Sequence, residues 1–143
     1  MKRSRALAGK DFVAPTGEEY AEAAALREAL RIFQRQSEAI TTARGLTSRT
    51  YQLLLMIKTA QAGGGSIGLT ELEQRLQLGK STVTELVLRT EARGFVRREL
   101  DRTRPRGIAV SLTAEGERRL ARAVRELGDE RSRLLDGLGE LRK

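Results

Sequence analysis

The spacing of the apolar residues changes once along this chain, and that change constrains the fold more than any other feature. From residue 16 to residue 93 most apolar residues recur at intervals of three and four, which is typical of one face of an α-helix. The segments 95–100 and 108–112 instead alternate apolar and polar residues, as half-buried strands do. Pro105 and Gly107, between these segments, favour the tip of a hairpin. We therefore predict a mainly α-helical fold with one small β-hairpin.

Two helices are predicted in the N-terminal part of the chain. Thr16 and Glu19 have the spacing of a capping box, and the helix that they open is expected to end near Gly45. A second helix is expected from residue 47 or 48 to about residue 62. The segment 63–66 contains three consecutive glycines, which make continued helix too costly in backbone entropy, so this segment is predicted to be a loop.

A short helix, a turn and a longer helix are predicted next. Thr70 and Glu73 repeat the spacing of a capping box and are expected to open the short helix. The longer helix is expected over residues 80–93, with Gly94 ending it. Its buried face is predicted to consist of Val83, Leu86, Val87 and Thr90.

A last long helix is predicted to begin after Thr113, whose side chain can cap it. Its apolar residues alternate spacings of four and three, which is the heptad pattern of a helix that packs against a partner helix. Glycines weaken its end, so we expect a bend or fraying from about Asp136 onward. The heptad positions are Leu120, Val124, Leu127, Arg131, Leu134, Leu138 and Leu141.

The positive charge of the chain is concentrated in two short segments. Lysine and arginine number 27 against 19 acidic residues, a formal charge of +8. Residues 1–10 contain four bases and no acid, residues 97–106 contain five arginines and two acids, and residues 11–96 are balanced. This distribution predicts a surface that binds an anionic partner. A general preference for arginine, which supplies 22 of the bases, is the alternative explanation.

The chain contains neither cysteine nor histidine, which excludes most catalytic chemistry. Disulfides, thiolate nucleophiles, histidine-based acid–base catalysis and zinc sites with cysteine ligands are all ruled out. We therefore predict that the protein is not an enzyme and holds no cofactor or metal. The longest apolar run, residues 53–57, is far shorter than the ~20 residues of a membrane span, and residues 1–10 lack a hydrophobic signal core. We expect a cytoplasmic protein without membrane contact.

The predicted order of a short helix, a turn, a second helix and a two-stranded hairpin is that of a winged helix-turn-helix. In this arrangement the second helix fits the major groove of double-stranded DNA, and the hairpin, or wing, reaches phosphates or the minor groove. We predict a basic flexible tail over residues 1–15, a dimerisation helix over 16–45, a winged helix-turn-helix DNA-binding domain over 46–112 and a second dimerisation helix over 113–143.

The sequence resembles the MarR family of transcriptional regulators in the order and spacing of several motifs. These motifs are Leu69-Thr70-Glu71-Leu72, Lys80-Ser81-Thr82-Val83-Thr84, Glu91-Ala92-Arg93-Gly94-Phe95-Val96, Arg106-Gly107 and Val110-Ser111-Leu112-Thr113-Ala114-Glu115-Gly116. The resemblance implies a homodimer that binds a pseudo-palindromic DNA operator, usually as a repressor. It also implies a small, often aromatic, effector whose binding releases the DNA.

Three features depart from the family pattern. The wing of the family usually has an aspartate two positions before its arginine, whereas this chain has Arg104 before Arg106, so either Asp101 orients Arg106 or no residue does. Glu85 occupies a recognition-helix position that often carries a base-contacting arginine. The sequence ends soon after Leu141, where family members usually continue into another helix.

Three sets of candidate residues follow from these patterns and the resemblance. The DNA-binding set is Lys80, Ser81, Thr82, Thr84, Arg89, Arg102, Arg104 and Arg106. The ligand-binding set is Tyr20, Phe33 and Tyr51, with a place in the core as the alternative. The dimerisation set is Leu26, Leu30, Leu120, Val124, Leu127, Leu134 and Leu138. For Ser81 the alternative role is capping of its helix, and Leu88 is either exposed or an extra packing contact.

Two other functions fit the same sequence. The first is a sequence-tolerant architectural nucleic-acid-binding protein, which would bind with a strong salt dependence and little preference among sequences. The second is a dimeric protein-interaction module in which the winged domain is a scaffold, and replacing the wing arginines would leave its activity unchanged.

Overall fold

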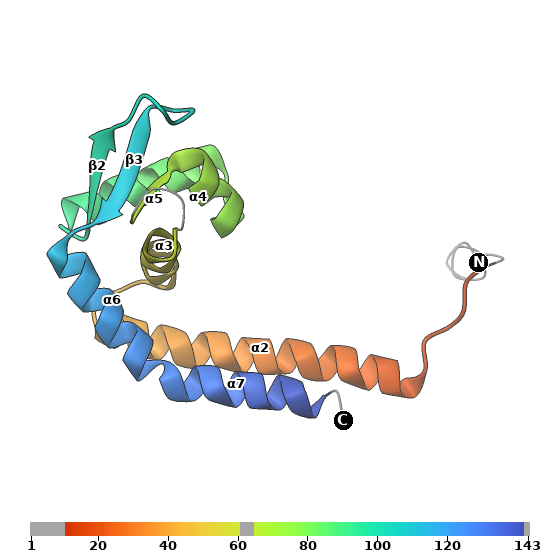
Figure 1. The fold of residues 1–143 in the computed structure, drawn as a ribbon. Helices are drawn as coiled ribbons and strands as arrows, with labels where there is room; N and C mark the ends of the chain where they lie inside the picture. The colour runs from red at the N-terminus through yellow and green to blue at the C-terminus, as the bar shows by residue number, and fades with distance from the viewer. Residues whose placement is uncertain (1–10, 61–64, 142–143) are drawn as a thin grey trace.

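The computed structural model describes residues 11–60 and 65–141, and in these ranges the fold consists of six helices and a three-stranded sheet (Figure 1). The elements are α2 (Gly17–Ala43), α3 (Ser48–Lys58), β1 (Ser66–Gly68), α4 (Leu69–Leu76), α5 (Lys80–Ala92), β2 (Val96–Leu100), β3 (Ile108–Leu112), α6 (Ala114–Glu126) and α7 (Gly128–Glu140). The predicted mainly helical fold with a small hairpin is confirmed. No helix in the described ranges is both long enough and apolar enough to cross a membrane.

The long helix α2 runs antiparallel to α7, and together they form an arm that extends from the rest of the molecule (Figure 1). The predicted capping box is present, because Thr16 Oγ1 accepts from the Glu19 amide at 3.1 Å and Glu19 Oε1 accepts from the Thr16 amide at 3.3 Å. The helix ends at Arg44, and Gly45 follows with a φ of +75°. At 1.5 Å per residue, the 27 residues of α2 span about 40 Å.

The core lies between α3 and the winged part of the chain, and not in the arm. Leu53, Leu54 and Ile57 of α3 are fully buried, whereas Thr41 is the one buried residue of α2 and none of α7 is buried. Helix α3 ends at Lys58, about four residues earlier than predicted. Its buried partners are Leu46, Ile67, Leu69, Leu72, Val83, Leu86, Val87, Phe95, Val96, Val110, Leu120 and Ala123.

The sheet has the order β1-β3-β2 and is antiparallel throughout. The predicted hairpin is confirmed, with Val96 opposite Leu112 and Leu100 opposite Ile108. Strand β1 was not predicted, since the sequence placed Ser66 in a loop. Ser66 instead pairs with Ser111 across β3. Residues 63 and 64 of the predicted loop, and residues 61 and 62 of the preceding predicted helix, lie outside the described residues.

Helix α4 begins one residue before Thr70, so the predicted capping box at Thr70 and Glu73 is wrong. Gly68 is the N-cap residue and provides no side-chain hydrogen bond. The physical reason is the third strand: Gly68 is held extended by its pairing with Ala109, and the helix therefore starts directly after it. Thr70 is thereby placed inside the first turn, where its side chain no longer has the position of a cap.

The last helix is divided at Leu127, and not at Asp136 as predicted. Helix α6 starts from Thr113, whose Oγ1 accepts from the Gly116 amide at 3.0 Å as predicted. Leu127 is 3% exposed and separates α6 from α7, which continues to Glu140 beside α2. Leu120 is also 3% exposed. Both leucines are therefore covered by their own chain, and the prediction that they form an intermolecular seam is wrong.

Candidate nucleic-acid interface

Helices α4 and α5 form a helix-turn-helix whose position is fixed by hydrogen bonds to α3. The turn contains Gln77, which adopts the left-handed conformation with a φ of +56°. Arg75 of α4 donates to the Met56 carbonyl at 2.6 Å and to Thr59 Oγ1 at 2.8 Å. These bonds satisfy acceptors at the C-terminal end of α3, and they hold α4 in one orientation on the core.

The inner face of α5 is buried as predicted. Val83, Leu86, Val87 and Thr90 are all at most 2% exposed, and the Thr90 hydroxyl donates to the Leu86 carbonyl at 2.6 Å. Because this face fills the core, the opposite face of α5 is left to contact a partner. That face consists of the exposed residues Lys80, Ser81, Glu85, Leu88 and Arg89, with Thr82 and Thr84 half-buried beside it.

The first turn of α5 is open to an anion. Gly79 is its N-cap and provides no side-chain bond, so Ser81 is not the cap, and the first turn contains no acidic residue. The backbone N–H groups of a helix N-terminus point outward and carry partial positive charge, which favours a phosphate. Lys80 lies in this turn and has no ion-pair partner among the residues that the structure describes.

The outer face of α5 also carries one acidic and one apolar residue. Glu85 lies 4.0 Å from Arg89, and both side chains are mostly exposed, so the pair is weak and screened by salt. Leu88 is 42% exposed, which decides between its two predicted roles in favour of an exposed apolar residue. A side chain of this kind can contact the methyl group of thymine in a major groove.

The wing between β2 and β3 is closed by a compact turn centred on Asp101. Asp101 Oδ1 accepts from the Thr103 amide at 3.0 Å and from the Thr103 hydroxyl at 2.5 Å. These hydrogen bonds lower the pKa of Asp101, and the nearby Arg104 contributes to the same shift. Gly107 closes the turn with a φ of +68°, a conformation that favours glycine.

Arg104 points back from the wing toward β1. Its Nε lies 3.2 Å from Asp101 Oδ2, and its NH2 donates to Ser66 Oγ at 3.1 Å. The side chain passes directly over Gly68, where an added Cβ would lie 3.2 Å from Arg104 Cδ. Asp101 therefore holds Arg104, and the prediction that Asp101 orients Arg106 is wrong.

Arg106 is held by Glu73, a carboxylate that the sequence pattern assigned to a capping box. It forms an ion pair with Glu73 of α4, and its NH2 lies 3.4 Å from Thr84 Oγ1 on α5. The side chains of Arg106 and Glu73 are 25% and 19% exposed. The pair fastens the wing to both helices of the helix-turn-helix. No local pattern reveals it, because the two residues are 33 positions apart.

The remaining wing arginines are more exposed than this pair. Arg97 lies 3.5 Å from Glu99, and Arg98 lies 2.9 Å from Glu91. Arg102 is exposed at the tip of the wing and has no hydrogen-bond or ion-pair partner within residues 11–60 and 65–141. The wing therefore presents one uncommitted arginine, although five arginines occur in this segment.

The three aromatic candidates do not form one pocket. Tyr20 is 64% exposed in the first turns of α2, and Phe33 lies 13 residues further along this helix, about 20 Å away. Phe33 lines a cavity of about 220 Å³ between α2 and α7 with Leu134. Tyr51 of α3 packs against the core, and burial raises its pKa, while the positive charge of Arg131 acts in the opposite direction.

A larger cavity lies between α3 and α6, where the arm joins the winged part. Its volume is about 670 Å³. Leu55, Leu120 and Val124 provide an apolar floor. Lys58, Arg125 and Arg131 supply positive charge at the rim, and Lys58 pairs with Glu117 at 3.0 Å. Cavities of this size accept drug-sized ligands.

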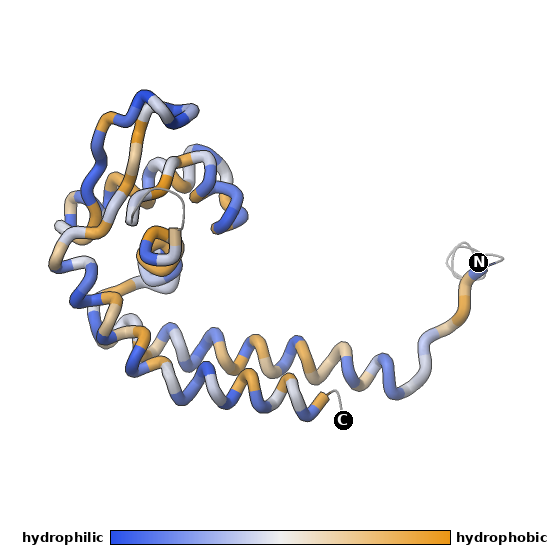
Figure 2. Tube along the Cα trace, viewed as in Figure 1, coloured by the Kyte–Doolittle hydropathy of each residue, from blue (hydrophilic) through white to orange (hydrophobic). Residues whose placement is uncertain are grey.

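The arm exposes apolar side chains along its length, and Figure 2 shows hydrophobic and hydrophilic residues alternating along both α2 and α7. Leu26, Ile32 and Leu135 are 38%, 51% and 62% exposed. Leu30, Leu134 and Leu138 are half-buried, and Val124 packs against the core. Residues 1–10 of the predicted basic tail lie outside the described residues.

Comparisons with known proteins identify the fold. No family model matches the sequence, and no curated protein matches it closely enough to count as a relative. Among solved structures, AbsC, a MarR family transcriptional regulator from Streptomyces coelicolor, is 22% identical with a TM-score of 0.76, over 88% of this chain and 84% of that one. A mutant MarR from E. coli complexed with operator DNA is 20% identical with a TM-score of 0.68, over 87% and 88%. CouR from Rhodococcus jostii, bound to p-coumaroyl-CoA, is 25% identical with a TM-score of 0.67, over 78% and 76%.

Proposed function

We propose that this chain, which has the fold of the MarR-family transcriptional regulators, is a homodimeric repressor that binds a specific sequence of double-stranded DNA. The observation that carries the proposal is the outer face of α5. This face combines a first turn without acidic residues, the hydroxyl group of the exposed Ser81, and Lys80, which has no ion-pair partner among the described residues. The MarR structure complexed with operator DNA supports the same use of the fold.

In this proposal α5 enters the major groove with its first turn toward the DNA. The hydroxyl groups of Ser81, Thr82 and Thr84 bond base edges or phosphates, since a hydroxyl can both donate and accept. Lys80 and Arg89 contact phosphates, which provide affinity but no sequence information. Glu85 accepts from a cytosine amino group, and this contact offsets its repulsion from phosphate.

The wing is assigned two different roles. Arg102 contacts a phosphate, because its side chain is exposed at the tip and free of partners in the described structure. Arg104 and Arg106 position the wing, because both side chains are mostly buried and bonded to other elements of the chain. These two arginines thus act on DNA binding through the geometry of the hairpin.

The dimer is proposed to form through the arm. In a single chain the apolar side chains of Leu26, Ile32 and Leu135 are exposed to water. A second copy of α2 and α7 would cover this apolar surface, which is favourable. A two-fold dimer places two copies of α5 in successive major grooves, about 34 Å apart. The operator is then an inverted repeat with half-sites one helical turn apart. Repression follows when the bound dimer blocks access to a promoter.

Release of the DNA by a small aromatic effector is the finer part of the proposal. The α3–α6 cavity joins an apolar floor to arginine side chains at its rim, which suits an aromatic ring carrying an acidic group. The structure of CouR bound to p-coumaroyl-CoA supports ligand binding by this fold. Replacing Val124 by Trp would narrow the cavity, and the repressor should then still bind DNA but respond less to the effector.

The DNA-binding function is tested by selecting duplexes from a random library and titrating the selected duplex by fluorescence anisotropy. A scrambled duplex of equal length is the control, and both are measured at two salt concentrations. We expect a preference of ~10³-fold or more for the selected sequence. The variant Ser81→Ala/Thr82→Val should lower this preference, while Arg27→Gln on the exposed part of α2 should not. Equal, salt-sensitive binding to both duplexes would instead indicate an architectural protein.

A further inference from the structure

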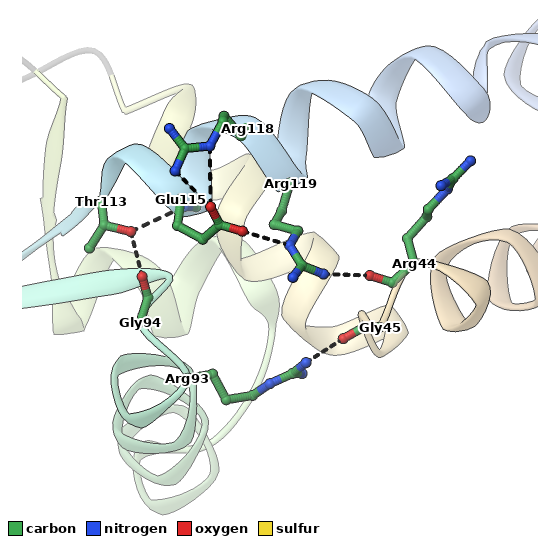
Figure 3. Close-up of polar contacts among 9 residues, drawn as sticks. Arg44, Gly45, Arg93, Gly94, Thr113, Glu115, Arg118 and Arg119 are labelled. Carbon is green, nitrogen blue, oxygen red and sulfur yellow. Dashed lines mark hydrogen bonds and ion pairs between the residues drawn. The ribbon is translucent and has the colours of Figure 1, made fainter.

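A groove rich in arginine lies where the end of α2 and the turn to α3 meet the first half of α6 (Figure 3). Its volume is about 550 Å³ and it is open to solvent. The groove lies at the end of α5 that Arg93 caps, opposite to the end with Lys80, so it is separate from the proposed DNA contacts. It is lined by Ala43, Arg44, Gly45, Glu115, Arg118, Arg119 and Arg122.

Glu115 orders two of the guanidinium groups. Arg118 donates to Glu115 Oε2 through Nε at 3.2 Å and NH2 at 2.7 Å, and Arg119 donates to Oε1 through Nε at 2.9 Å. The hydrogen bonds from Arg119 and Arg118 lower the pKa of Glu115, so the carboxylate stays ionised at neutral pH. Each guanidinium group has five N–H donors, so each retains donors that point away from Glu115.

The backbone of the turn between α2 and α3 forms the other side of the groove and is held by two arginines. Arg119 donates through NH1 to the Arg44 carbonyl at 3.0 Å, and Arg93 donates through NH2 to the Gly45 carbonyl at 2.6 Å. The same two guanidinium groups lie over the ring of Phe95, with centroid distances of 5.4 Å and 4.9 Å. Arg93 and Arg119 are therefore structural, and they link the turn after α2 to the winged part.

The charges of the groove are not balanced within the chain. Four arginines line it, and Glu115 is the acidic residue of the lining. Arg44 is paired with Glu126 at 2.5 Å, which neutralises one further charge. Arg122 is exposed and has no ion-pair partner within the described residues. Two positive charges therefore remain uncompensated in the groove, and Arg93 adds a third beside it.

We propose that this groove binds a small anion with two acidic groups, of the phosphate or carboxylate class. Planar guanidinium groups bond the oxygens of both classes in pairs, and an anion with two negative charges matches the surplus of the groove. Arg118 and Arg122 are one turn apart on α6, line the groove and are both exposed to solvent, so they supply the main contacts to the ligand.

The test uses the full-length protein without DNA, so it does not depend on the proposed regulatory function. Sodium pyrophosphate and sodium succinate are titrated separately by isothermal calorimetry at 150 mM NaCl. The variant Arg118→Gln/Arg122→Gln removes the ligand contacts and keeps the structural Arg93 and Arg119. The matched control, Arg27→Gln/Arg31→Gln, removes the same charge from exposed positions of α2.

We expect saturable binding of at least one probe by the wild type and the control, and binding at least about tenfold weaker in the groove variant. Saturation by pyrophosphate alone identifies a phosphate ligand, and saturation by succinate alone identifies a dicarboxylate. Absence of saturable binding to either probe overturns the proposal. Equal binding by the groove variant, or equal weakening in the control, would also overturn it, because the anion would then bind elsewhere or through net charge alone.

Discussion

The ion pair between Glu73 and Arg106 provides the sharpest test of how the wing works. Glu73→Gln and Arg106→Gln each leave a mostly buried polar partner without its opposite charge. Exposed ion pairs contribute about 0.2–1 kcal/mol, and breaking a fully buried one costs about 3–5 kcal/mol. Side chains that are 19% and 25% exposed fall between these cases, so each variant should lose about 1–2 kcal/mol of unfolding free energy.

The stability effect is measured by urea unfolding at a fixed protein concentration, since dimerisation would otherwise change the midpoint. The double variant Glu73→Gln/Arg106→Gln completes a thermodynamic cycle. Its loss should be smaller than the sum of the two single losses by about 1 kcal/mol, which is the coupling of residues in direct contact. Additive losses would show that the ion pair does not stabilise the wing.

DNA binding by the same variants separates positioning from direct contact. If Arg106 positions the wing, Glu73→Gln and Arg106→Gln should weaken binding by similar factors and leave the salt dependence unchanged. If Arg106 contacts a phosphate, Glu73→Gln should tighten binding because it frees the arginine, and Arg106→Gln should lower the salt slope by about 0.9 for each subunit. This second outcome would refute the positioning role. Arg102→Gln is the matched control, and it should lower the slope by about 0.9 per subunit without loss of stability.

Three further predictions concern the scaffold. Gly116→Ala places a methyl group 2.0 Å from the Phe95 carbonyl oxygen, so it should lower the unfolding free energy by about 3 kcal/mol or more. The control Gly79→Ala has open space around the added methyl group and should cost less than half as much. If the proposed dimer forms through the arm, Leu135→Asp should yield monomers in light scattering while the far-UV circular dichroism of the helices is retained, and a dimer that persists would place the interface elsewhere. The pKa of Asp101 is lowered in the folded state, so its contribution to stability is present above its unfolded pKa and is lost as the pH falls through the folded value. Asp101→Asn should therefore flatten the acid side of the stability profile, and an unchanged profile would contradict this assignment.

Features that depend on neighbouring residues were predicted correctly from the sequence. The capping box at Thr16, the cap at Thr113 and the buried face of α5 are confirmed, because each depends on residues within one or two turns. The hairpin formed by β2 and β3 is confirmed for the same reason, since the two strands are close in sequence.

The errors concern contacts between distant segments. Strand β1 has three residues, too few for a periodic pattern, and it exists because β3 offers it an edge. That pairing moved the start of α4 and removed the cap predicted at Thr70. The break at Leu127 coincides with burial of this residue within the chain, at the point where α6 ends and α7 turns along α2. Gly137 and Gly139 do not end the helix near Asp136, since α7 continues to Glu140.

The same distinction between local pattern and distant contact changes the interpretation of the charge. The five arginines of residues 97–106 predicted a wing with a large positive surface. In the structure Arg104 and Arg106 are largely buried and bonded to carboxylates. Arg97 pairs with the exposed Glu99, and Arg98 pairs with the half-buried Glu91. Arg102 alone among the five has no partner in the described structure. Under the proposed function, we therefore expect the wing to contribute less to DNA affinity than its composition indicates, and sequence discrimination to depend mainly on the exposed face of α5.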